Sequence, residues 1–163
     1  MTDDLSQPES TPNPATNVPH VPHVPFLEFL NIVRVEQKDG RAIFRMTIDD
    51  IHLRSLGIMH GGVTATLLDT AMGMAARTMA PPDHHVVTVQ LNVNFTRPAW
   101  NGETVTAVGE VQHSGRQTAV VRGELRTADN LLVATGSATM MYLPRPDGET
   151  MDKHGEPAGR VKP

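Results

Sequence analysis

The residues with types and spacing suited to chemistry lie in one stretch, which begins with His60-Gly61-Gly62 and includes Asp69. Glycines at the start of a helix let a ligand approach the backbone, and the free N–H groups of the first turn stabilise negative charge. Asp69 is the one carboxylate in the small and apolar segment 59–80, where desolvation would tune it as a general base or a nucleophile. The alternative is a structural carboxylate, hydrogen-bonded to the threonines of the same segment: Thr64, Thr66 and Thr70.

The spacing of His60 and Asp69 restricts how they can cooperate. They are nine residues apart, which is roughly 13 Å along a helix and about half a turn out of phase. They therefore cannot meet within one protomer. If both serve one site, that site combines the start of one helix with the middle of another. A two-fold dimer with neighbouring helices would form two such composite sites.

The elements that position these residues follow from the apolar pattern. Segment 59–80 is apolar nearly all round and is predicted to be a buried helix, ended by Pro81-Pro82. Period-two alternation and turn residues predict strands before and after it, and short links between strands imply antiparallel neighbours. We expect an α+β fold, a curved antiparallel sheet of about six strands wrapped around one long central helix. The other predicted elements are a short helix at 26–32 and strands at 33–37, 41–48, 87–95, 104–112, 117–126 and 131–142.

Composition limits the classes of protein and partner. Residues 26–143 are expected to form one domain, between a disordered Pro-rich tail at 1–25 and a flexible tail at 144–163. A net charge of −4 with scattered Lys and Arg argues against nucleic acid. The absence of cysteine excludes thiolate nucleophiles and cysteine-ligated metals, and the charges of Asp69 and Arg77 argue against a membrane span. No secretory signal is visible, so a cytoplasmic protein is expected.

The motif Gly57-Ile58-Met59-His60-Gly61-Gly62, continued by Leu67-Leu68-Asp69 and Gly73, resembles the G-x-x-H-G-G-x-x-x-x-L-x-D signature of hotdog-fold thioesterases. The similarity is closest to the phenylacetic-acid-degradation (PaaI-like) subgroup of acyl-CoA thioesterases, within the 4-hydroxybenzoyl-CoA thioesterase superfamily. Residues 88–99 are similar to that family's first strand after the helix, and the resemblance covers about 26–142. It implies hydrolysis of an acyl- or aryl-CoA to free acid and coenzyme A, without metal or redox cofactor. The implied assembly is a homodimer with shared sites, in a dimer of dimers.

The resemblance also implies roles for individual residues. The Gly61 N–H would be the oxyanion donor, His60 would orient the same region, and Asp69 would be base or nucleophile. Thr88 falls where relatives carry a Ser or Thr that positions water, although a polar residue on the wet face of a strand is its simpler interpretation. Gly62 would belong to the substrate site. Met59 would help to line the acyl pocket, together with Met72 and Met74. The alternative is that these methionines are ordinary core residues.

Three arginines are further substrate-binding candidates. Arg97 and Arg116 could contact the phosphates of coenzyme A, or could simply be solvated. Arg54 stands where many relatives have Asn, six residues before the motif His. It could pair with Asp69, bind a substrate carboxylate or point to solvent.

Two alternatives to a thioesterase remain open at this point. One is a hotdog hydroxyacyl dehydratase, which lacks this motif spacing. The other is a non-catalytic acyl-CoA-binding hotdog protein, which the unusual Arg54 keeps in consideration. The pair His84-His85 is interpreted as a solvated loop and not as a metal site, because no third ligand falls at a suitable spacing.

Overall fold

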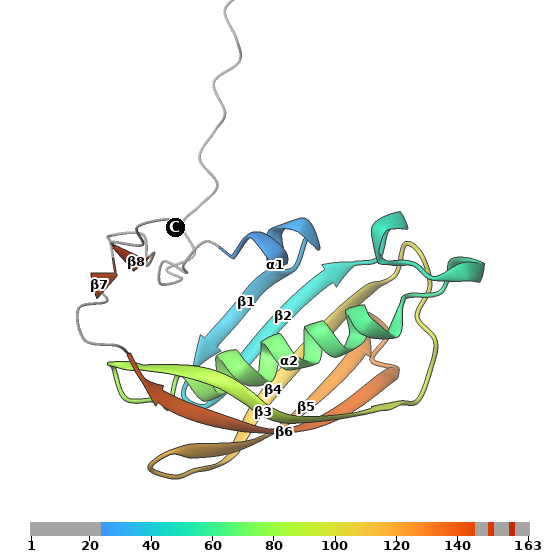
Figure 1. Ribbon diagram of the computed structural model, residues 1–163. Helices are drawn as coiled ribbons and strands as arrows, with labels where there is room; N and C mark the ends of the chain where they lie inside the picture. The colour runs from blue at the N-terminus through green and yellow to red at the C-terminus, as the bar shows by residue number, and fades with distance from the viewer. Residues whose placement is uncertain (1–23, 146–149, 152–156, 159–163) are drawn as a thin grey trace, which may run out of the picture.

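The computed structural model describes residues 24–145, 150–151 and 157–158 of the chain. A six-stranded antiparallel sheet, in the order β1-β2-β4-β5-β6-β3, curves around helix α2 (Gly61–Arg77), as Figure 1 shows. The expected hotdog architecture is confirmed. The remaining elements are α1 (Pro25–Phe29), β1 (Val33–Lys38), β2 (Arg41–Thr47), β3 (His84–Phe95), β4 (Thr104–Ser114), β5 (Thr118–Thr127), β6 (Leu132–Pro144), short 3₁₀ turns at Asp50–His52 and Ser55–Gly57, and the small pair β7 (Thr150–Met151) and β8 (Pro157–Ala158).

The local signals in the sequence account for most of these elements. The β1–β2 turn has positive φ at Asp39 and Gly40, as its Asp-Gly sequence predicts. In β2, alternate side chains are buried, as expected from the period of two: Ala42, Phe44 and Met46. Helix α2 begins at Gly61, after the N-cap His60 and the bridge of Met59 to Leu53, and it ends at Arg77, so it is shorter than the predicted 59–80. The predicted tails lie mostly outside the described residues.

A row of three glycines sets the depth at which α2 rests on the sheet. Gly109, Gly123 and Gly136 are register partners on β4, β5 and β6. A Cβ on Gly109 would clash with the backbone carbonyl of Ala71, and one on Gly136 would lie 3.0 Å from the Met72 Cε. The glycines thus form a trough for the middle of the helix.

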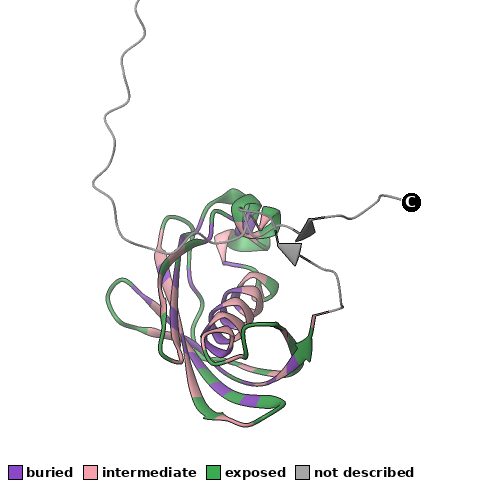
Figure 2. Cartoon of the chain, turned by 90° about the vertical axis from the view of Figure 1, so that its left-hand side faces the viewer, coloured by how far each residue is buried: buried purple, intermediate pink, exposed green. Residues whose placement is uncertain are grey.

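The helix is not buried all round, which corrects the sequence-based expectation. Its sheet-facing side is buried in the core, whereas Asp69, Thr70 and Gly73 on its other side are only half-buried (Figure 2). In the protomer alone, therefore, Asp69 is not enclosed by the protein. Within the described ranges, no helix has the length and apolar character needed to cross a bilayer.

The two edges of the sheet differ in how they are protected. β1 is six residues long, carries Arg34, Glu36 and Lys38, and has a bulge at Val35. Such charges discourage pairing with another chain, and they distinguish β1 from β3, since both strands have a bulge. β3 is twelve residues long and contains no Lys, Arg, Asp, Glu or Pro. The β3 edge is thus an unprotected edge, and it exposes three large apolar side chains: Val87, Val89 and Phe95.

Candidate active site

The start of α2 presents backbone N–H groups, one of which is capped by its own N-cap residue. His60 has extended backbone dihedrals, and its Nδ1 accepts a 2.9 Å hydrogen bond from the Gly62 N–H. A neutral His60 in this arrangement carries its proton on Nε2. A Cβ at position 62 would lie 2.9 Å from Nδ1, so Gly62 is required for the cap. His60 and Gly62 together fix the geometry of the first turn.

The Gly61 N–H remains available. Within residues 24–145 it donates to no other group, as expected for the first residue of a helix. The glycine backbone borders a cavity of about 410 Å³, whose lining also includes Arg54, Met59 and Arg97. Phe95 on β3 packs beside it, since a Cβ on Gly61 would lie 3.4 Å from the phenyl ring. An open N–H at a helix start, with two cations nearby, suits an oxyanion.

The carboxylate of Asp69 is held by Thr88 and not by the threonines of its own helix. The Thr88 hydroxyl donates a 2.8 Å hydrogen bond to Asp69 Oδ1. A bulge in β3, where the register with β6 shifts between Thr88 and Gln90, turns Thr88 toward the helix. Leu91 and Val93, which follow the bulge, also pack against the core. Simple alternation put Thr88 on the face opposite these two residues, and the bulge makes that expectation wrong.

Asp69 and Thr88 line a second cavity of about 720 Å³. This cavity has no lining residue in common with the cavity beside Gly61. Within one protomer, the helix start and the carboxylate therefore belong to different cavities, as the helical spacing of His60 and Asp69 predicts. Arg54 lies in the cavity of Gly61 and so does not pair with Asp69 of the same protomer.

The other candidates divide between these cavities and the core. Met59 is buried at the first cavity, Met74 lines the second, and Met72 is fully buried against the glycine row. Arg116, in the β4–β5 turn, lines neither cavity. Among the residues with described positions, no group of three or more His, Asp or Glu side chains is arranged to hold a metal ion.

His52 is a supporting residue that the sequence did not indicate. Its side chain is fully buried, its Nδ1 lies 3.0 Å from the Asp49 N–H, and its Nε2 lies 3.0 Å from the Leu30 carbonyl. Its own carbonyl accepts a 2.8 Å hydrogen bond from the His60 N–H. His52 thus ties the chain that leads into α2 to the segment after α1. A lone histidine in an aperiodic loop gives no signal of this role.

Comparison with known proteins places these features in a family. The thioesterase superfamily model matches residues 56–134, which include the motif, α2 and both halves of the site. Human acyl-coenzyme A thioesterase 13 is 30% identical over 111 residues, 66% of this chain and 77% of that protein. A putative esterase from Caenorhabditis elegans is 29% identical over 119 residues, 72% of this chain and 70% of that protein.

Solved structures share the fold of this chain. The Escherichia coli PaaI protein of the phenylacetic acid degradation operon matches with a TM-score of 0.69 and 27% identity, covering 74% of this chain and 85% of that one. A mutant of the phenylacetic acid degradation protein PaaI from Thermus thermophilus matches with a TM-score of 0.68 and 28% identity, covering 74% of this chain and all (100%) of that one.

Proposed function

The chain belongs to the thioesterase superfamily and is a thioester hydrolase, and we propose that it cleaves acyl-coenzyme A at composite sites shared by two copies of the chain. The observation that carries the proposal is that β3 touches both halves of the site and is also an unprotected edge. Thr88 holds Asp69, and Phe95 packs beside Gly61. Pairing of two β3 edges is therefore a direct way to join the two halves.

The geometry of an antiparallel strand pair supports this assembly. In a two-fold pair, residue numbers on opposite strands add to a constant. An axis beside Asn92 would set Phe95 of one copy opposite the bulge residue Val89 of the other, which is a neighbour of Thr88. The Gly61 N–H of one chain would then approach Asp69 of its partner. The exposed side chains of Val89 and Phe95 would be buried in the same step.

The chemistry follows from the two halves. The thioester carbonyl oxygen accepts a hydrogen bond from the Gly61 N–H, which stabilises the oxyanion of the tetrahedral intermediate. Asp69 either takes the proton of an attacking water or attacks the carbonyl carbon itself. In both routes the C–S bond breaks, coenzyme A leaves as the thiol after protonation, and water supplies the second oxygen of the free acid. The Thr88 hydroxyl holds one carboxylate oxygen, so the other can face the substrate.

The substrate lies across both cavities in this proposal. Arg54 and Arg97 border the Gly61 cavity, and none of its described lining residues carries a carboxylate. This surplus of positive charge suits the phosphates of coenzyme A. Arg116 has no substrate contact in the proposed arrangement. No metal or redox cofactor takes part, because a carboxylate and an amide donor supply the base and the oxyanion site.

The proposed assembly is a dimer of dimers in the cytoplasm, where acyl-CoA is available. Val87 and Val120 are exposed on the outer face of the sheet, on strands at and near the β3 edge, and offer apolar surface for a second dimer. The mass of the particle in solution tests this assembly.

Thiol release from a panel of acyl-CoA substrates tests the activity. Replacement Asp69→Asn keeps the size of the side chain and the acceptor for Thr88 but removes the base, so kcat should fall by about 100-fold or more. Asp129→Asn, in the exposed β5–β6 turn, is the matched control and should hydrolyse at the wild-type rate. Equal rates for both variants would overturn the assignment of Asp69.

A further inference from the structure

The cavity that contains Asp69 extends along the helix to a group of arginines. Asp69, Gly73 and Arg77 all line it and follow one another at intervals of four residues. Such a spacing keeps them along one side of α2, with about 12 Å of helix axis between Asp69 and Arg77. Gly73 has no side chain to obstruct the path between them. The cavity is thus a channel with a carboxylate at one end and a cation toward the other.

Three guanidinium groups line this cavity: those of Arg34 on β1, Arg77 at the end of α2 and Arg145 after β6. Among the described residues lining it, Asp69 alone carries a carboxylate, and Thr88 already holds that group. The Arg145 Nε is buried and has no hydrogen-bond partner in the described part of the chain. Burial lowers the pKa of Arg34. Among the described lining residues, Arg77 and Arg145 therefore have no carboxylate other than that of Asp69 to balance their charge.

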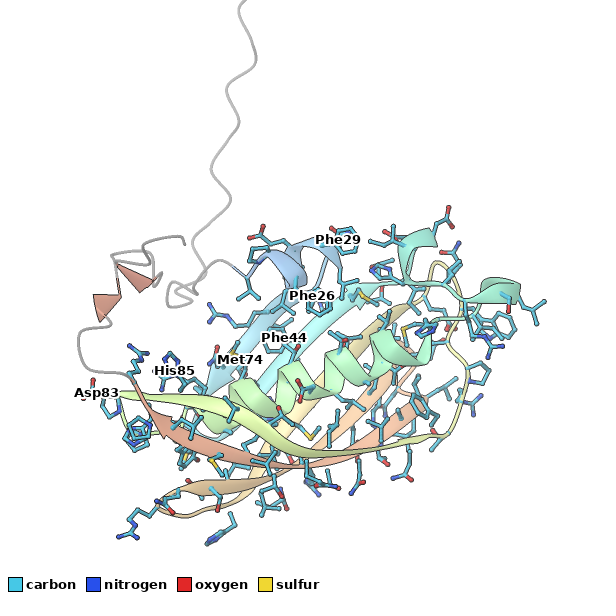
Figure 3. All side chains as sticks on the ribbon, viewed as in Figure 1. Phe26, Phe29, Phe44, Met74, Asp83 and His85 are labelled. Atoms are coloured by element: carbon cyan, nitrogen blue, oxygen red, sulfur yellow. The ribbon has the colours of Figure 1, made fainter. Side chains whose placement is uncertain are left out.

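The walls between the ends of the channel are mainly apolar. Phe26 of α1 and Met74 of α2 line it, with His85 at the start of β3, and Figure 3 labels these three side chains. Leu27, Val86 and Met140 add to the apolar surface, and the polar side chains in the wall are those of Gln37, Thr66, Thr70 and His85. A volume of about 720 Å³ is typical of a small-molecule site. Apolar walls with a cationic end fit a hydrocarbon chain or ring that ends in an anion.

We propose that this cavity receives the acyl group and that Arg77 and Arg145 bind a carboxylate at its far end, so that the preferred substrates are carboxyl-terminated acyl-CoA thioesters. This inference rests on the proposed function. The phosphates of coenzyme A are the other possible anion, but Arg54 and Arg97 are available to them in the separate cavity beside Gly61. A bulky solvated nucleotide also suits apolar walls poorly.

The test compares adipoyl-CoA with hexanoyl-CoA, which differ only in the terminal carboxylate. The wild-type enzyme is expected to show a kcat/KM at least about tenfold higher for adipoyl-CoA, because charge-assisted hydrogen bonds hold the carboxylate. Arg77→Met keeps the apolar stem and should remove most of this preference. Arg145→Met is a second variant with the same expected effect. Arg122→Met is the control, because Arg122 pairs with Glu110 on the outer face of the sheet and its loss should leave the preference intact.

N-acetylcysteamine thioesters of the same two acids separate the two sources of negative charge, because they lack the nucleotide. The preference for the adipoyl group should persist in them and should again depend on Arg77. Arg77→Met could instead lower kcat/KM equally for both CoA thioesters and leave it unchanged for both N-acetylcysteamine thioesters. That result would assign the arginines to the phosphates and overturn the inference. Equal kcat/KM values of the wild-type enzyme for hexanoyl-CoA and adipoyl-CoA would also overturn the inference, while leaving the proposed function intact. Failure to hydrolyse any of the thioesters would instead defeat the proposed function.

Discussion

Thr88 Oγ1 lies 2.8 Å from Asp69 Oδ1, and this hydrogen bond joins the edge strand β3 to the middle of α2. It fixes the carboxylate at the side of the protomer where the sheet is unpaired. The residue that we assign as base or nucleophile is therefore held by the strand that we expect to form the dimer interface. Catalysis and assembly depend on the same strand.

The hydrogen bond itself can be tested by changing Thr88 without changing its shape. Thr88→Val removes the hydroxyl and should lower kcat by roughly tenfold, since a hydrogen bond to a charged group contributes about 1.5 kcal/mol or more. Thr88→Ser keeps the hydroxyl and should retain most of the activity. Steady-state kinetics, with particle mass measured in parallel, separate this effect from loss of assembly. A Thr88→Val variant that is at least as active as Thr88→Ser would show that kcat does not depend on the hydrogen bond.

The glycine trough predicts a large stability difference between two glycine substitutions. Gly109→Ala directs a methyl group into the backbone of α2 at Ala71, and such overpacking lowers the free energy of unfolding by about 1–3 kcal/mol. Gly115→Ala, in the β4–β5 turn, meets atoms no closer than 3.4 Å and should be nearly neutral. Chemical denaturation of both variants measures the difference. Similar midpoints would mean that the helix can move away from the sheet at no cost.

The two edge strands offer a matched pair of substitutions for the dimer interface. Val89 and Val35 are both bulge residues on edge strands, exposed by 55% and 40%. Val89→Lys adds a charge to the unprotected edge and should convert the dimer to a monomer, with loss of hydrolysis. Val35→Lys adds the same charge to the β1 edge and should leave mass and activity unchanged. Light scattering after size exclusion gives both masses, and a dimeric, active Val89→Lys would exclude pairing through β3.

Local patterns in the sequence were enough to predict the sheet, the central helix and the separation of His60 from Asp69. These follow from periodicity, turn residues and helical spacing, which neighbouring residues determine. The partner of Asp69 could not be predicted in this way, because the bulge at Val89 reverses which residues of β3 face the helix. Nor could the exposure of the Asp69 side of α2, since an apolar helix face can be covered by a second chain as well as by its own.

Longer-range relationships were also hidden. Gly109, Gly123 and Gly136 each interrupt a predicted strand, but only the register between strands shows that they form one trough. Arg34, Arg77 and Arg145 are far apart in the sequence, and only the fold places all three along one cavity. In the sequence, Arg97 and Arg116 were equivalent candidates for phosphate contacts. In the structure, Arg97 lines the cavity beside Gly61, whereas Arg116 lines neither cavity.

The central claim is that each site combines the Gly61 N–H of one chain with Asp69 of another. Gly61→Pro removes this N–H at the first helical position, where proline is well tolerated, and the extended conformation of His60 is compatible with a following proline. Gly61→Ala keeps the N–H and serves as the control for the added carbon. Both Gly61→Pro and Asp69→Asn should be nearly inactive alone.

The most direct measurement is the activity of a sample in which Gly61→Pro and Asp69→Asn chains are co-expressed in equal amounts. Random pairing makes half of the dimers mixed, and each mixed dimer has one intact composite site of two. We predict that thiol release recovers to about a quarter of the wild-type rate. A mixture that contains mixed dimers and is no more active than either variant alone would contradict the shared site.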